Sequence, residues 1–190
     1  MKKLLIFSFA ILFTFCSYSQ NWQKVKVKAN RHYPTKIFCF DRSMKAEADI
    51  MFDANCWYDR SGGRYNGLNK LFGISNLFQS VHNNSARFVW YPAISKDSID
   101  IYFYCYLNHV SPQQNQKYKG FIKRVAILDS HNYKVLDYLN KYEFYIDDEL
   151  LKTLETHKRK HYTFSYYHGL YIGGTFTLPF EISVNYIIHY

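Results

Sequence analysis

Hydrophobic and polar residues alternate along most of this chain of 190 residues, and the stretch 98–106 shows the pattern most clearly. One set of alternate positions is apolar: Ile99, Ile101, Phe103 and Cys105. The other set is polar or aromatic: Ser98, Asp100, Tyr102, Tyr104 and Tyr106. A period of two is typical of a β-strand with one face in the core, so this stretch predicts a half-buried strand.

Shorter alternations recur along the chain, at 24–28, 45–52, 144–146 and 181–187. Turn-forming residues separate them, as in Asn83-Asn84-Ser85 and Gly173-Gly174. One segment, 147–160, has leucines at helical spacing after two aspartates, and a helix and a strand with its turn fit it equally well. Many short strands without alternating helices predict an all-β fold, an antiparallel β-sandwich or barrel.

The N-terminus predicts export. Lys2 and Lys3 precede an apolar run at 4–15, and small residues at 17 and 19 suit a cleavage site before Gln20. We therefore expect a signal peptide at 1–19 and a single β-sandwich domain at 20–190, secreted or periplasmic. A lipid anchor at Cys16 is less favoured, because the residues before it are bulky. No other apolar run is long enough to span a bilayer.

Composition and motifs exclude several classes of function. Aromatic residues make up 20% of the chain, which excludes a disordered protein. The net charge is +9, yet export and the lack of a nucleic-acid-binding module argue against nucleic acid. Nucleotide-binding and metal-binding motifs are missing, so we expect no cofactor and no metal. The mature chain keeps Cys39, Cys56 and Cys105, which we expect to be buried, and their disulfide pairing stays open.

Residues 69–90 begin with Asn-Lys-Leu-Phe-Gly and continue to His82, Asn84-Ser85-Ala86-Arg87 and Trp90, and a Gly-Gly pair follows at 173–174. This order resembles small secreted bacterial proteins with an NKLFG…NSAR…GG pattern. More distantly, it is similar to the concanavalin-like jelly-roll polysaccharide lyases, which carry an SAR-x-x-W strand followed by a Tyr-rich strand. The resemblance implies a jelly roll whose concave sheet holds a sugar chain.

The first functional hypothesis is glycan binding, with an anionic glycan favoured by the basic candidates. Tyr side chains offer flat apolar surface with a polar tip, which suits sugars. The candidate ligand-binding residues are Lys70, Arg87, Trp90, Tyr102, Tyr104 and Tyr106. Trp90 belongs to this set only if its strand turns it outward, because a shift of one residue exchanges the two faces of a strand.

The second hypothesis is a polysaccharide lyase that cleaves a uronate polymer by β-elimination. Arg87 or Lys70 would neutralise the carboxylate, and His82 or Tyr104 would move the proton. Three polar positions of the family pattern are replaced here; for example, Tyr91 and Pro92 follow Trp90 where the pattern has Arg. These losses leave binding without catalysis ahead. A third hypothesis is a non-catalytic interaction module that uses the basic residues at 157–161.

Overall fold

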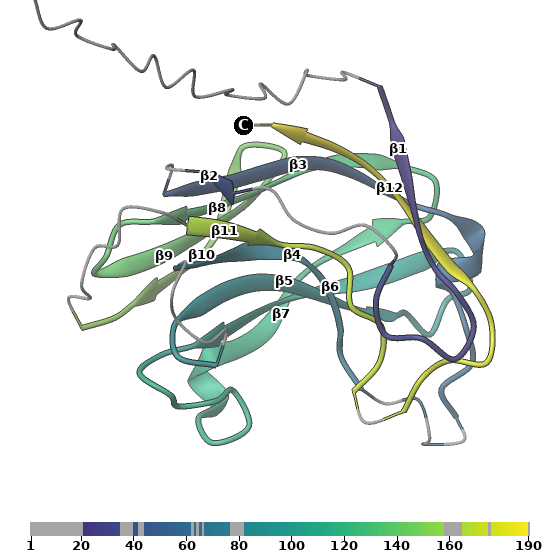
Figure 1. Ribbon diagram of the computed structural model, residues 1–190, viewed down its shortest axis with the longest axis horizontal. Helices are drawn as coiled ribbons and strands as arrows, with labels where there is room; N and C mark the ends of the chain where they lie inside the picture. The colour runs from purple at the N-terminus through teal and green to yellow at the C-terminus, as the bar shows by residue number, and fades with distance from the viewer. Residues whose placement is uncertain are drawn as a thin grey trace, which may run out of the picture.

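A computed structural model of the protein describes residues 21–34, 40–41, 44–61, 63, 65, 67–76, 82–157, 165–174 and 176–189. The expected signal peptide with Cys16, the thiol of Cys39 and most of the basic segment 157–161 lie outside these residues. Within the described residues, the strands form two antiparallel sheets of six strands each, which confirms the predicted all-β fold. The sheets stack as two layers (Figure 1).

The first layer, called sheet A here, joins the two ends of the described chain. Its first and last strands in sequence lie side by side, as Figure 1 shows in purple and yellow. In spatial order its strands are β1 (Gln23–Val27), β12 (Ile182–His189), β3 (Lys45–Phe52), β8 (Ser130–Asp137), β9 (Lys141–Ile146) and β10 (Glu149–Glu155). A short 3-10 turn, η1 (Ala54–Cys56), follows β3.

The second layer, sheet B, contains the segment that carries the family resemblance. In spatial order its strands are β2 (Phe40–Asp41), β11 (Ser165–His168), β4 (Asn69–Asn76), β5 (Ser85–Pro92), β6 (Ser98–Tyr106) and β7 (Lys119–Ala126). A second 3-10 turn, η2 (Gln116–Tyr118), leads into β7. The hydrophobic core lies between the two sheets and takes in alternate residues from each.

The strand β6 has the two faces that its sequence predicts. Its apolar set points into the core, where each side chain is at most 5% exposed: Ile99, Ile101, Phe103 and Cys105. Its tyrosines therefore lie on the outer face of sheet B. Cys56 and Cys105 are both buried, as expected for small apolar side chains.

The segment 147–155 is a turn and a strand and not a helix. Asp147 and Asp148 both have positive φ, 55° and 61°, which gives the two-residue turn that joins β9 to β10. A bulge between Leu150 and Lys152 then shifts the register of β10. Because of that extra residue, the leucines that face the core are not spaced by two, and their spacing imitates a helix.

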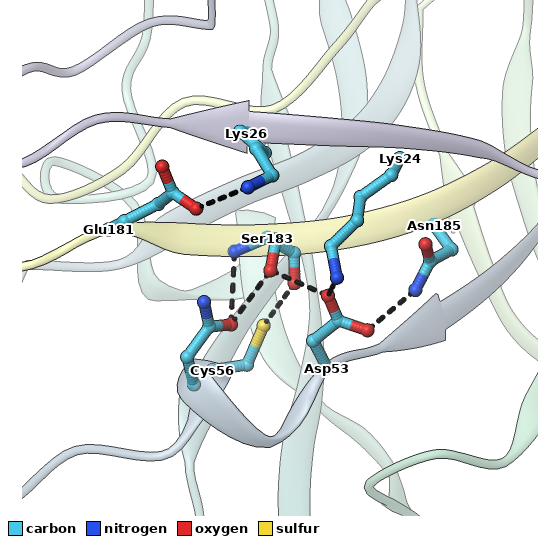
Figure 2. Close-up of polar contacts among 8 residues, drawn as sticks. Lys24, Lys26, Asp53, Cys56, Glu181, Ser183 and Asn185 are labelled. Carbon is cyan, nitrogen blue, oxygen red and sulfur yellow. Dashed lines mark hydrogen bonds and ion pairs between the residues drawn. The ribbon is translucent and has the colours of Figure 1, made fainter.

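A partly buried polar network connects strand β1 to the rest of sheet A (Figure 2). The carboxylate of Asp53 accepts hydrogen bonds from Ser183 Oγ at 2.6 Å and from Asn185 Nδ2 at 2.7 Å. The ammonium group of Lys24, on β1, lies 2.6 Å from the same carboxylate. Burial raises the pKa of Asp53, but these partners outweigh it and the net pKa is lowered.

Candidate functional site

The outer face of sheet B brings together side chains from four neighbouring strands. Residues that pair directly across antiparallel strands share a face. His168 of β11 pairs with Gly73 of β4, Gly73 pairs with Arg87 of β5, and Arg87 pairs with Tyr104 of β6. These four residues form one row across the sheet, and the missing side chain of Gly73 lets Arg87 pack closely against β4.

A second row lies beside the first and is mainly aromatic. Tyr171 bridges to Lys70, Lys70 pairs with Val89, Val89 with Tyr102, and Tyr102 with Phe121 of β7. The rings of Tyr102 and Phe121 meet edge to face at 5.6 Å. Phe121 is 56% exposed, so the row ends in an apolar surface at the edge of the sheet.

Several side chains on this outer face are buried although they lie outside the core. Arg87 and His168 are each 8% exposed and Tyr104 is 3% exposed. Gln113, in the loop after β6, contacts the Tyr104 hydroxyl through both atoms of its amide, at 2.9 and 3.1 Å. The loop thus holds Tyr104 in place beside Arg87.

His82 reaches the same place from the turn before β5. Its ring meets the ring of Tyr106 edge to face at 4.9 Å, and Tyr106 meets Tyr104 in the same way at 5.8 Å. Lys70 Nζ lies 4.9 Å from the centre of the Tyr171 ring and 5.9 Å from that of Tyr104, and it donates to the Leu68 carbonyl. Lys70, His82, Arg87 and His168 are called the basic cluster below.

Positive charges in the basic cluster repel one another, so each group is harder to protonate than it would be alone. Burial, followed by the charge of Arg87, lowers the pKa of Lys70 to about 8. Burial followed by Arg87 also lowers the pKa of His82, and that of His168 falls well below its usual value. Among the described residues, no carboxylate contributes to any of these three shifts. An anion bound here would relieve the repulsion.

The Tyr104 hydroxyl is uncharged at neutral pH, unlike the cations around it. Burial raises the pKa of its hydroxyl to about 12, so the hydroxyl stays protonated at neutral pH. A buried phenol of this kind can donate a hydrogen bond or a proton, and a neutral imidazole such as that of His82 can accept a proton. The face therefore offers cations, a proton donor and a proton acceptor close together.

Six of the seven predicted site residues lie together on this face: Lys70, His82, Arg87, Tyr102, Tyr104 and Tyr106. The prediction for Trp90 is wrong. Trp90 points inward, is fully buried, and packs edge to face against Phe52 of sheet A at 5.3 Å. Since Arg87 and Val89 point outward on β5, the alternation of the strand turns Trp90 into the core.

Two contributors were not foreseen from the sequence. His168 lies in β11, far along the chain from the NSAR block. The sequence therefore gives no sign that it shares a row with Arg87. The segment after β1 supplies His32, whose ring stacks on Tyr171 at 5.1 Å, and Tyr33, which meets Tyr171 edge to face. Only the sheet topology brings these segments together.

A cavity of about 260 Å³ lies at the end of β10, and no residue of the basic cluster lines it. Its lining combines the loop after β6, η2 and the end of β10: Leu107, Asn108, Tyr118, Glu155, Thr156 and His157. Glu155 gives this cavity an acidic group, whereas the basic cluster brings four basic side chains together. An anionic ligand would therefore favour the outer face of sheet B.

Within the described ranges, no group of three His, Cys, Asp or Glu side chains could hold a metal ion. Across those same ranges, no helix is both long and apolar enough to cross a membrane.

Solved structures with the same fold include carbohydrate-active enzymes. The alginate lyase AlyC3 superposes with a TM-score of 0.57 at 9% sequence identity, over 87% of this chain and 73% of the lyase. The alginate lyase Aly36B, solved with an alginate trisaccharide, gives 0.56 at 11% identity over 90% and 80%. The laminarinase catalytic domain of Thermotoga maritima gives 0.52 at 8% identity over 87% and 74%.

These similarities show that the chain has a jelly-roll β-sandwich fold, as its sequence predicts. Neither a protein-family model nor a curated protein matches the sequence. At about one identical residue in ten, the likeness defines the fold, and the function has to be argued from the site itself.

Proposed function

We propose that the protein is exported and binds an anionic polysaccharide of the uronate class on the outer face of sheet B. The observation that carries the proposal is the basic cluster: Arg87 and His168 are buried and Lys70 is half-buried on one face, beside the rings of Tyr104 and Tyr171. A uronate carboxylate would pair with Arg87 and Lys70, and the tyrosine rings would contact the sugar faces.

The solved structures of this fold support the same class of ligand. They include two alginate lyases, one of them in complex with an alginate trisaccharide. This support is an analogy at the level of the fold. The side chains of the basic cluster supply the specific argument for a negatively charged sugar.

A second candidate function is β-elimination, because His82 can accept a proton while Tyr104 can donate one. The lowered pKa of His82 leaves its imidazole neutral at neutral pH, whereas Tyr104 keeps its proton. His82 would take the proton from C5, the carbon that carries the uronate carboxylate. The electrons of that C5–H bond would form the C4–C5 double bond as the C4–O bond breaks. Tyr104 would protonate the leaving oxygen, while Arg87 and Lys70 would stabilise the charge that develops on the carboxylate.

The test is a panel of uronate and neutral polysaccharides, with binding and ultraviolet absorbance of unsaturated uronate products measured on the same samples. We expect binding to uronates and a loss of at least about tenfold in affinity for Arg87→Gln. The matched control is Lys134→Gln, which removes a cation from the outer face of sheet A. Thermal unfolding of each variant separates lost binding from lost folding.

The two candidate functions then give different results. Product that disappears in His82→Asn, while binding remains, would establish the lyase. Binding without product would leave recognition alone. Equal affinity for neutral and uronate polysaccharides, or an Arg87→Gln variant that folds and binds like the wild type, would overturn the proposal.

A further inference from the structure

Arg60 packs on Tyr91 at the outer face of sheet B, and Tyr91 lies two outward positions beyond Arg87 on β5. Its guanidinium carbon is 3.7 Å from the centre of the Tyr91 ring, a close cation–π contact. Tyr91 points outward from β5 like Arg87 and Val89, and its ring meets Tyr102 edge to face at 5.6 Å. Arg60 and the aromatic row are therefore parts of one continuous surface.

The charge of Arg60 is not neutralised within the described residues. Its guanidinium forms no hydrogen bond or ion pair with them, and its buried Nε has no hydrogen-bond partner there. Arg124, on the same face, differs, because Asp100 accepts from its Nε at 2.6 Å and from its Nη2 at 3.1 Å. An arginine fixed on a ring keeps its N–H groups in one plane, ready for a carboxylate.

The spacing between Arg60 and the basic cluster suits a polymer. Arg87 and Tyr91 are four residues apart on β5, which corresponds to about 14 Å along an extended strand. Val89 and Tyr102 lie between them and provide a mainly apolar floor. A single sugar ring cannot reach both cations, whereas a chain with acidic groups on successive units can.

We propose that Arg60, Tyr91 and Tyr102 form a second anion subsite, which binds another carboxylate of the same polyuronate chain. This inference rests on the proposed function and adds a direction to it: the chain lies along β5 and β6, from the basic cluster towards Arg60. Long substrates gain affinity from the second subsite, and short ones do not reach it.

The test compares Arg60→Gln with Lys134→Gln, using a long oligouronate and a uronate dimer in calorimetric titrations. Lys134 is the matched control because its ammonium also lies over a tyrosine ring, that of Tyr145, on sheet A. We expect Arg60→Gln to lower affinity for the long chain about tenfold, since a charge-assisted contact is lost, and to leave the dimer unchanged. Arg60→Lys should recover part of the loss, because it keeps the charge without the planar fork.

The outcomes separate this inference from the function on which it rests. If Arg87→Gln loses binding but Arg60→Gln binds the long chain like the wild type, the second subsite is refuted and the proposed function stands. If Arg60→Gln weakens the dimer as much as the long chain, Arg60 belongs to the first subsite and the inference is again wrong. If no uronate binds to the wild type, both proposals fall.

Discussion

Gly73 lies directly opposite Arg87 on neighbouring strands, and nothing larger than its hydrogen fits there. A Cβ at Gly73 would come within 2.2 Å of the Ala86 carbonyl oxygen, 2.6 Å of Arg87 Cα and 3.0 Å of Arg87 Cγ. The two backbones and the arginine side chain are packed together. The glycine of the NKLFG block therefore has a physical role: it lets β4 pack closely against the residue at the centre of the basic cluster.

Replacing Gly73 by Ala should damage both folding and binding. We expect the free energy of unfolding to fall by about 1–3 kcal/mol, because a methyl group has to displace the backbone of β5. Affinity for uronates should fall with it, since Arg87 moves. Denaturant titration and calorimetry on the same sample measure both.

The control for Gly73 is Gly120→Ala, in strand β7 of the same sheet. Its added Cβ would meet the far edge of the Phe103 ring at 2.7 Å, on the core side of the sheet. This variant should lose stability and keep its affinity for uronates. A Gly73→Ala protein as stable as the wild type would contradict the packing described here.

Trp90 should matter for stability and not for ligand binding. Its side chain is fully buried, so Trp90→Ala should lower the free energy of unfolding by about 3–5 kcal/mol. The milder Trp90→Phe keeps a ring in the core and should bind uronates with the affinity of the wild type. A folded Trp90→Phe protein with clearly weaker binding would show that Trp90 contributes to the binding site after all.

The fold was predictable because the alternation along the strands is strong. In β6 each apolar residue is buried and the tyrosines face outward, as the period of two requires. Trp90 was misplaced because a tryptophan suits a sugar-binding face and a core equally well. The position of Arg87, three residues earlier on the same strand, already decided between them.

Other features could not be predicted because they depend on irregularities or on distant pairing. The bulge in β10 breaks the period of two and makes its leucines look helical. His168 joins the basic cluster only through the pairing of β11 with β4, and Arg60 joins the face only through its contact with Tyr91. Local patterns carry no information on such contacts.

Acid should weaken the connection of β1 to sheet A. The folded-state pKa of Asp53 is lowered, so its contribution to stability is complete above the unfolded pKa, near 3.9, and is lost as the pH falls through the folded value. Asp53→Ala should cost about 1–3 kcal/mol at neutral pH, since buried Asn185 loses its acceptor and buried Ser183 loses the nearer of its two. The variant should also show a flatter loss of stability in acid.

Lys26 provides the matched control on the same strand, because it pairs with Glu181 at the surface. Lys26→Met should change the free energy of unfolding by less than about 1 kcal/mol. Denaturant titrations between neutral and acidic pH measure both variants. Equal effects of Asp53→Ala and Lys26→Met would refute the importance of the partly buried network around Asp53.

The pH dependence of binding should follow Lys70. Its pKa is about 8, so the ammonium that attracts a carboxylate is lost as the pH rises through that value, and affinity for uronates should fall between pH 7 and 9. Lys70→Met should bind more weakly and lose this dependence, whereas Lys70→Arg should keep binding at alkaline pH.

If the protein is a lyase, the pH profile of its rate should have a rising part as well as a falling part. The rate should rise with pH as His82 loses its proton, below its usual range, and fall again near pH 8 as Lys70 is deprotonated. A rate or affinity that increases through pH 8 would instead make neutral Lys70 the active form and contradict its role as the carboxylate partner.

The most direct measurement is nuclear magnetic resonance mapping of backbone and side-chain shifts while an oligouronate is added. We predict that the shifts concentrate on the outer face of sheet B, at Lys70, Arg87, Tyr102 and Tyr104, and leave the outer face of sheet A unchanged. Shifts confined to sheet A, or to the cavity beside Glu155, would show that the basic cluster is not where the sugar binds.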